Sequence, residues 1–205
     1  MQPAILVPST LDEETARAEI YGLLAALFYA PPGPELLDNL RLAVTEAPAA
    51  GALLEGSWGE LVAVARDMSN QQIADEYDAL FGGVGRPEVY LFGSHYLSGF
   101  LNEKPLAALR GDLAELGLAR DDTMSETEDH YAYLCEVMRY LIAGDDVEVA
   151  NLTRQREFFT RHLQPWALLM CDAISAHPKA RFYKSLASFT HTFTHVESQG
   201  FDMLA

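Results

Sequence analysis

Apolar residues recur at helical spacing along nearly the whole chain, and the first such segment starts near Thr10. Thr10 and Glu13 have the spacing of a capping box, which satisfies free backbone N–H groups at a helix start. Pro31 and Pro32 lie where the pattern stops, and proline ends a helix because it lacks the N–H group that would continue it. The segment therefore predicts an amphipathic helix. Its expected core positions are Ala16, Ile20, Leu23, Leu24, Leu27 and Phe28.

The same period predicts helices over most of the remaining chain. Ser57 and Glu60 have capping-box spacing and mark one helix start. Ser125 and Glu128 mark another in the same way, and Asn70 is the expected cap of a helix between them. The expected helices cover residues 34–46, 57–68, 70–81, 94–102, 105–116, 125–143, 146–162, 166–176 and 179–197. We predict one all-α domain over residues 1–205, a single-domain helical bundle of about nine or ten helices.

Residues 82–93, GGVGRPEVYLFG, interrupt this pattern. Three glycines in four residues make a regular helix expensive, because glycine loses more backbone freedom on ordering than any other residue. The stretch is therefore expected to be a loop. Its apolar end, Val89 to Phe92, still has to pack against something.

Charge is distributed unevenly along the chain. The formal net charge is −16; residues 1–150 hold 26 acids against 8 Lys and Arg, and residues 151–205 hold 4 against 6. Nucleic acids are held chiefly by Lys and Arg that neutralise phosphates, so this balance argues against a nucleic-acid partner. It favours a basic partner, which a negative field attracts.

Cysteine usage and the apolar runs indicate where the protein works. Cys135 and Cys171 lie in apolar helical contexts and form no CxxC pair, so we expect buried thiols in a reducing cytosol and no disulfide. The N-terminal stretch MQPAILVPSTLDEE has no basic region, which argues against a secretory signal. No apolar run approaches the roughly 18 residues of a membrane span. The sequence predicts a soluble cytoplasmic protein without membrane insertion.

Residue spacing disfavours three common kinds of reactive site. His191 and His195 have a spacing that can hold zinc, but the inserted glutamate of metalloproteases and a third ligand are missing, so two surface histidines are the better interpretation. The GGVGRP stretch lacks the residue order of a phosphate-binding loop. Cys135 lies on an apolar stripe, where a thiol behaves as a small hydrophobic group. We expect no metal, no cofactor and no catalytic residue.

The stretch SETEDH, residues 125–130, combines Glu126, Glu128, Asp129 and His130 at a predicted helix start. The helix dipole stabilises acids in a first turn by roughly 0.3–1 kcal/mol each, so a solvated helix start explains the carboxylates without any function. The same dipole disfavours the cation of His130. Two aspartates just before this stretch bring the total to five acids within nine residues, more than capping requires. The local pattern leaves a recognition site and a solvated helix start both open.

Three stretches follow one another along the chain: EYDALFGGVGRPEVYLFGSHYL, SETEDHYAYLCEVMRYL and QREFFTRHLQPW. Together they resemble the TorD/DmsD/NarJ family of cytoplasmic chaperones for redox enzymes, and the resemblance spans residues 14–195. The family's Glu-Pro-x-Asp-His signature is matched at residues 126–130, with Thr127 in place of proline. Its Tyr-x-x-Leu-Phe-x-Gly stretch is matched by Tyr77, Leu80, Phe81 and Gly83, and its Phe and His-Leu-x-x-Trp region, expected in the core, by Phe158, Phe159, His162, Leu163 and Trp166.

The resemblance implies a non-enzymatic role. Such chaperones bind the twin-arginine leader peptide, and often the apo form, of a molybdenum-cofactor catalytic subunit of the DMSO reductase type, until the cofactor is inserted and export can proceed. Monomer and helix-swapped dimer are both compatible with the long helices. A leader offers two arginines followed by apolar residues, so its receptor needs carboxylates beside a hydrophobic groove.

On this basis we expect a peptide-binding site at the SETEDH stretch. Glu126 and Asp129 would bind the guanidinium groups, and His130 would support Asp129 or respond to pH. One alternative is a NarJ-like assembly factor for a non-exported molybdoenzyme, which only the client can distinguish. A nucleotide-binding or hydrolysing protein is disfavoured because the phosphate loop is missing. The expected groove residues are Leu80, Phe81, Pro87, Tyr90 and Phe92.

Overall fold

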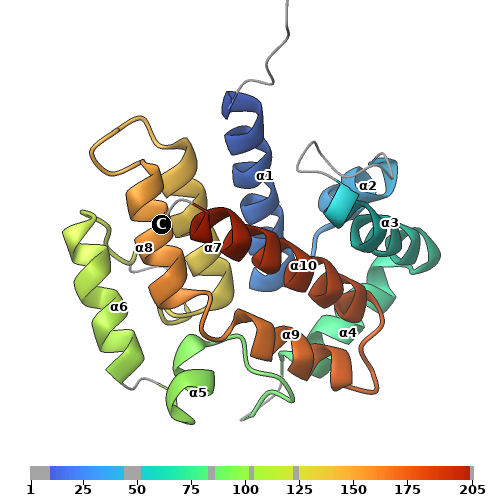
Figure 1. The fold of residues 1–205 in the computed structure, drawn as a ribbon. Coiled ribbons are helices and arrows are strands. Elements are labelled where there is room, and N and C mark those ends of the chain that lie inside the picture. The colour runs from blue at the N-terminus through green and yellow to red at the C-terminus, as the bar shows by residue number, and fades with distance from the viewer. Residues whose placement is uncertain (1–9, 44–51, 83–85, 102–103, 122–124, 204–205) are drawn as a thin grey trace, which may run out of the picture.

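The computed structural model describes residues 10–43, 52–82, 86–101, 104–121 and 125–203, which form ten α-helices and no β-strand (Figure 1). The predicted all-α fold class is therefore confirmed. The extent of the domain over residues 1–205 stays a prediction. The helices are α1 (Thr10–Tyr29), α2 (Pro34–Leu42), α3 (Ala52–Asp67), α4 (Asn70–Leu80), α5 (Gly93–Ser98), α6 (Lys104–Glu115), α7 (Tyr131–Ala143), α8 (Leu152–His162), α9 (Ala167–Ala176) and α10 (Phe182–Asp202).

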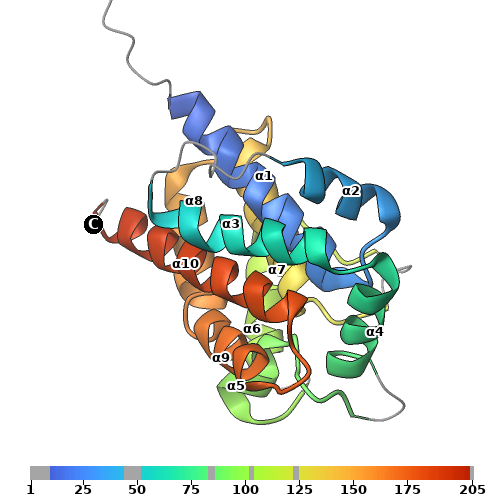
Figure 2. The same cartoon turned by 90° about the vertical axis from the view of Figure 1, so that its right-hand side faces the viewer.

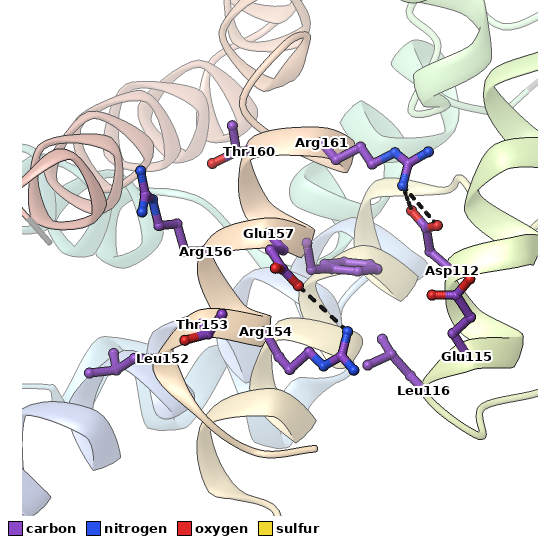
Figure 3. A pocket seen from close by; sticks show the side chains of 11 residues that line it. Asp112, Glu115, Leu116, Leu152, Thr153, Arg154, Arg156, Glu157, Thr160 and Arg161 are labelled. Atoms are coloured by element: carbon purple, nitrogen blue, oxygen red, sulfur yellow. Dashed lines mark hydrogen bonds and ion pairs between the residues drawn. The ribbon is translucent and has the colours of Figure 1, made fainter. Parts of the chain in front are cut away.

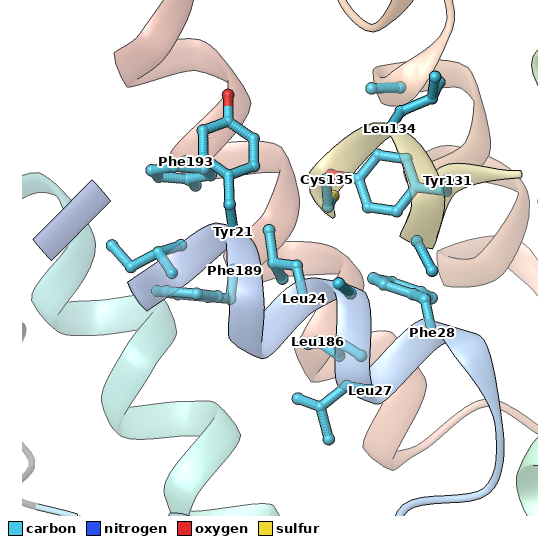
Figure 4. Close-up of a cluster of buried hydrophobic side chains, with 14 of the residues drawn as sticks. Tyr21, Leu24, Leu27, Phe28, Tyr131, Leu134, Cys135, Leu186, Phe189 and Phe193 are labelled. Atoms are coloured by element: carbon cyan, nitrogen blue, oxygen red, sulfur yellow. The ribbon is translucent and has the colours of Figure 1, made fainter. Parts of the chain in front are cut away.

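Helices α1, α7 and α10 form the centre of the core. α1 packs along α7, while α10 packs against α3, α4 and α9; Figure 2 shows α3 and α10 side by side. Edge-to-face rings join the three central helices: the ring centroids of Tyr21 and Phe193 are 4.9 Å apart, and those of Phe28 and Tyr131 are 5.2 Å apart (Figure 4). The predicted apolar stripe of α1 is buried, with only Leu23 partly exposed.

A buried ion pair fixes α1 against α10. The Nε of Arg17 lies 2.7 Å from Oε1 of Glu197, and its Nη2 lies 2.8 Å from Oε2, so the guanidinium binds both carboxylate oxygens. Tyr21 also donates to Glu197, and Arg17 donates to Gln155 of α8. Because the Glu197 side chain is buried, its charge requires these partners. The network holds three helices in one register.

Two predicted helix starts before the glycine-rich stretch are corrected by the structure. α3 begins at Ala52, and Ser57 lies inside it with its hydroxyl bonded to the carbonyl of Leu54, so the predicted capping box at Ser57 is wrong. The fully buried Leu54 explains the earlier start. α4 is capped by Ser69, in a capping box with Gln72, and Asn70 is the first helical residue.

The helix start at the SETEDH stretch is also corrected. α7 begins at Tyr131 with His130 as its N-cap, so the predicted capping box of Ser125 and Glu128 is wrong. Glu128 is paired instead with Arg110 of α6. The acids therefore precede the helix and do not lie in its first turn. α5 ends earlier than predicted, α8 begins later and α10 continues further, whereas the side chain of Thr10 and the whole of Gly83 lie outside what the structure describes.

Two further predictions concern burial, and a third concerns membrane spans. Cys135 and Cys171 are buried free thiols, as predicted, and burial raises the pKa of each. The third family motif is buried as expected, and Trp166 Nε1 donates to the carbonyl of His162 at 2.6 Å. None of the helices in the described ranges combines the length and apolar character that a bilayer crossing requires.

Candidate functional site

The two unusual stretches of the sequence meet in the structure. Residues 86–92 run outside any helix and end in an antiparallel bridge between Phe92 and His130. The N–H of Gly93 donates to the carbonyl of Asp129 at 2.9 Å. These contacts hold the stretch that leads into α5 beside the segment that leads into α7. We call this meeting point, residues 91–94 and 127–131, the junction.

Asp129 is only 3% exposed, and it caps α5. Its Oδ2 accepts from the N–H of Ser94 at 2.8 Å, and its Oδ1 accepts from the hydroxyl of Thr127 at 2.6 Å. With the bond from Gly93 to its carbonyl, Asp129 satisfies two N–H groups that have no helical partner at the start of α5. Both carboxylate oxygens are therefore engaged within the fold.

His130, equally buried, is the N-cap of α7. Its Nδ1 accepts from the N–H of Ala132 at 3.2 Å, so Nδ1 carries no proton. Burial lowers the pKa of His130 to about 4, although the charge of Asp129 opposes this shift. The ring centroid lies 5.0 Å from that of Phe92 and 5.7 Å from that of Tyr133. Near neutral pH the imidazole is an uncharged ring packed among aromatic side chains.

The remaining predicted groove residues lie in different surroundings. Leu80 is fully buried in the core, and Phe81 is partly buried against aromatic rings of α4 and α10. Tyr90 stacks on His95 with the ring centroids 4.0 Å apart, and Pro87, three positions earlier, is partly exposed. The structure thus brings Phe92, but not these four, into contact with His130. Their role in binding stays a prediction.

An apolar groove of about 540 Å³ opens between α1, the end of α6 and the outer face of α7. We call it the α7 groove. Its volume falls in the range of about 300–1,000 Å³ that is usual for ligand sites. The groove leaves apolar surface in reach of a partner. Its lining residues are Ala25, Ala26, Tyr29, Leu113, Leu118, Ala119, Arg120, Glu128, Ala132, Tyr133, Glu136, Val137 and Tyr140.

Two carboxylates are part of this lining. Glu128 pairs with Arg110 at 2.9 Å, and Glu136 pairs with Arg139 of its own helix at 2.9 Å. The hydrogen bond from Arg110 lowers the pKa of Glu128, so that carboxylate is ionised at neutral pH. The α7 groove therefore combines an apolar lining with two carboxylates, each paired with an arginine, and with the side chain of Arg120.

Tyr133 connects the α7 groove with the junction. Its ring centroid lies 5.6 Å from that of Tyr29, on the groove side, and 5.7 Å from that of His130. Burial and the neighbouring Tyr29 raise the pKa of Tyr133 to about 12; the backbone of Glu126 opposes this rise and the charge of its carboxylate adds to it. Glu126 is partly exposed and Asp129 is buried, so of the two acids expected to bind guanidinium groups Glu126 is the accessible one.

The α7 groove is not among the sites expected from the sequence, although α7 carries a signal for it. Tyr133, Val137 and Tyr140 recur at i, i+4 and i+7 and form a second apolar stripe on α7, separate from the buried stripe that includes Leu134 and Met138. A helix that is apolar on two faces needs a cover for the second face. The three partly buried or exposed residues line the groove because nothing in the described chain covers them fully.

A larger groove of about 900 Å³ lies between α6 and α8 (Figure 3). Arg161 pairs there with Asp112 at 2.9 Å, and Arg154 pairs with Glu157 at 3.5 Å. Three acids and three arginines line this groove, so the charges of its lining balance. Two carboxylates and one arginine, Arg120, line the α7 groove, which therefore suits a basic partner better.

The histidine pair of α10 has no further ligand beside it. His191 and His195 are exposed, and His195 contacts Gln199 at 3.2 Å. Within the described ranges, no group of three or more His, Cys, Asp or Glu side chains is placed to hold a metal ion.

One known family and several known proteins are similar to this chain in sequence. A family described as "Nitrate reductase delta subunit" matches residues 47–172, which include α3 to α8 and the junction. The chaperone protein TorD of Vibrio cholerae serotype O1 is 24% identical over 204 aligned residues, covering 92% of this chain and 93% of the relative. The chaperone protein TorD of Vibrio parahaemolyticus is 22% identical over 141 residues, covering 65% of this chain and 66% of the relative. Since the family match covers more than half of the sequence, the chain belongs to the nitrate reductase delta subunit family, which includes the TorD-like chaperones.

Proposed function

We propose that the chain is a maturation chaperone for a molybdenum-cofactor oxidoreductase, and that the α7 groove receives the twin-arginine leader of the catalytic subunit. Its relatives are named chaperones, which is a non-enzymatic role. The observation that carries the proposal is an apolar groove lined in part by two carboxylates, of which Glu128 has its pKa lowered by the hydrogen bond from Arg110. A segment with two arginines followed by apolar residues requires that combination.

The residues of the site divide into two groups in this proposal. Glu126 contacts the basic end of the leader, because it is partly exposed and lies close to Tyr133. Asp129 and His130 position the junction, since both are buried and their polar atoms are already bonded. The apolar end of the leader lies on the tyrosine and valine side chains of α7.

The charge of the whole chain supports this assignment. A net charge of −16 attracts a basic segment from a distance and disfavours nucleic acid. Most of the acids precede residue 151, and the residues that line the α7 groove belong to that part of the chain. Association with the client is therefore expected to weaken as salt concentration rises.

A second candidate is an assembly factor, similar to NarJ, for a molybdoenzyme that is not exported. The family described as "Nitrate reductase delta subunit" is compatible with both candidates. The same groove would then hold an N-terminal segment without a twin-arginine export motif. Replacing the paired arginines of the client distinguishes the two candidates, because only the first requires them.

The test is affinity capture from the cytosol of the native host, read by mass spectrometry. Val137→Lys places a cation in the α7 groove, while Val147→Lys makes the same substitution at a site that is 78% exposed and lies after α7. We expect wild type and Val147→Lys to retain one molybdenum-enzyme catalytic subunit, and Val137→Lys to lose it. Circular dichroism and thermal unfolding serve as controls that test whether both variants are folded.

Two other results would contradict the proposal. If no molybdenum-enzyme subunit comes down with wild-type protein, the chaperone function is wrong. If Val137→Lys retains the subunit as well as Val147→Lys does, the α7 groove is not the binding site. Retention that is unchanged when both client arginines become alanine favours the second candidate.

A further inference from the structure

Arg110 of α6 already binds a carboxylate of the α7 groove in the way that an incoming arginine would. Its Nε lies 2.9 Å from Oε1 of Glu128, and its Nη2 lies 2.9 Å from Oε2, so one guanidinium engages both oxygens. This two-point contact is how a carboxylate distinguishes arginine from lysine, whose ammonium group is a point donor. The site therefore contains an arginine recognition geometry filled by its own chain.

The two partners differ in their exposure to solvent. The Glu128 side chain is 13% exposed and lines the groove, whereas the Arg110 side chain is 52% exposed. A two-point contact of arginine with a carboxylate is stronger than most exposed ion pairs, but water competes for the half-exposed guanidinium, and the long side chain loses freedom in the pair. Arg110 is therefore the partner that can be exchanged, because water hydrates its charge when it leaves.

We propose that Glu128 is the receptor for an arginine of the client segment, and that Arg110 is a built-in competitor that occupies this receptor until the client displaces it. The inference rests on the proposed function, because the apolar part of the client has to occupy the α7 groove for the exchange to be favourable. Before binding, Arg110 keeps a partly buried carboxylate paired, which avoids an uncompensated charge.

Competition of this kind determines specificity. A free guanidinium gains nothing over Arg110, since it makes the same two hydrogen bonds. A peptide exchanges with Arg110 only if it adds apolar contacts in the groove. The site then selects an arginine that is followed by apolar residues, and it rejects isolated basic groups.

A purely structural role for the pair makes the opposite prediction. If Arg110 serves only to hold Glu128 or to fasten α6 to the junction, its removal loosens the receptor and weakens peptide binding. If it is a competitor, its removal strengthens binding. The direction of the change therefore separates the two roles.

The experiment measures fluorescence anisotropy of a labelled synthetic peptide that carries two adjacent arginines followed by leucine and alanine residues. Arg110→Gln is compared with Arg154→Gln, which removes the same charge from an exposed ion pair with Glu157. We expect Arg110→Gln to bind about two- to fivefold more tightly than wild type, the range that corresponds to a weak exposed pair. Arg154→Gln controls for the change in net charge and is expected to bind as wild type does.

Glu128→Gln completes the test. We expect it to weaken binding about tenfold and to reduce the preference for the arginine peptide over its lysine counterpart, because a charge-assisted two-point contact is lost. The inference is overturned if Arg110→Gln binds no more tightly than Arg154→Gln, or if Glu128→Gln keeps the arginine preference. If wild type binds the peptide no better than Val137→Lys does, the proposed function fails at this site and the inference fails with it.

Discussion

The carboxylate of Asp129 accepts a hydrogen bond from the backbone N–H of Ser94 at 2.8 Å, and so a residue that precedes α7 caps the start of α5. Both residues are buried. An acid within a recognition-like stretch of the sequence therefore has a structural role. A loss of client binding after Asp129 is replaced does not by itself locate the binding site, because the junction changes as well.

Asp129→Ala is expected to lower the free energy of unfolding by about 1–3 kcal/mol, because the buried N–H of Ser94 loses its acceptor. Asp129→Asn keeps an acceptor oxygen at the same place, so a smaller loss is expected. Urea denaturation followed by circular dichroism measures both changes.

Glu126→Ala is the matched control for Asp129→Ala. Its side chain is partly exposed, and its replacement is expected to change the free energy of unfolding by no more than about 0.5 kcal/mol. Equal stability of Asp129→Ala and Glu126→Ala would show that the cap of α5 is dispensable. The same two proteins also separate structure from recognition, because of these two residues Glu126 is the one proposed to touch the client.

The helices were predictable where the buried apolar residues form one stripe at helical spacing. The stripe of α1 from Ala16 to Phe28 is such a case, and Pro31 and Pro32 follow its end. The start of α3 was not predictable from capping residues alone. Ser57 and Glu60 have capping-box spacing inside a helix, and the burial of Leu54, which lengthens that helix, depends on tertiary packing.

The candidate site was predictable in part. The sequence singled out the two stretches that meet at the junction, but it could not assign the partners of their side chains. Asp129 bonds to a residue 35 positions away, and Glu128 to one 18 positions away, so no local pattern contains either contact. The α7 groove was not predicted because the helical pattern assigns Val137 to the same core stripe as Leu134 and Met138, whereas Val137 lines the groove with Tyr133 and Tyr140.

His130 is expected to make stability depend on pH. Its pKa is about 4 in the folded protein against 6.5 in the unfolded chain, so below pH 6.5 the unfolded state binds the proton more readily. Folding stability is therefore lost as pH falls from about 6.5 to about 4, with a limiting slope of about 1.4 kcal/mol per pH unit. Urea denaturation at a series of pH values measures the slope.

His130→Asn isolates this contribution, because asparagine can also cap a helix and does not titrate. The unfolding free energy of wild type minus that of His130→Asn should fall steadily toward acid pH. Carboxylates and His162 titrate in both proteins and cancel in the difference. Parallel pH profiles would mean that His130 gains its proton as easily in the folded protein as in the unfolded chain.

Gly93 marks a point where backbone approaches a core side chain too closely for any larger residue. A Cβ atom at this position would lie 2.9 Å from Nε1 of Trp166 and 3.0 Å from Cε2. Trp166 is held by its hydrogen bond to the carbonyl of His162 and by stacking on Tyr96, so it has little freedom to move. Gly93→Ala is therefore expected to destabilise the protein by about 1–3 kcal/mol in thermal or urea unfolding.

For the same substitution at Gly111 we expect the opposite effect on stability. Gly111 lies within α6, and a Cβ atom there meets nothing within 4 Å. Alanine is favoured over glycine in a helix interior by up to about 1 kcal/mol, so this variant should be more stable than wild type. If Gly93→Ala were stabilised to the same degree, Trp166 would have to move freely. The close approach of the junction to the His-Leu-x-x-Trp region would then place no constraint on the residue that begins α5.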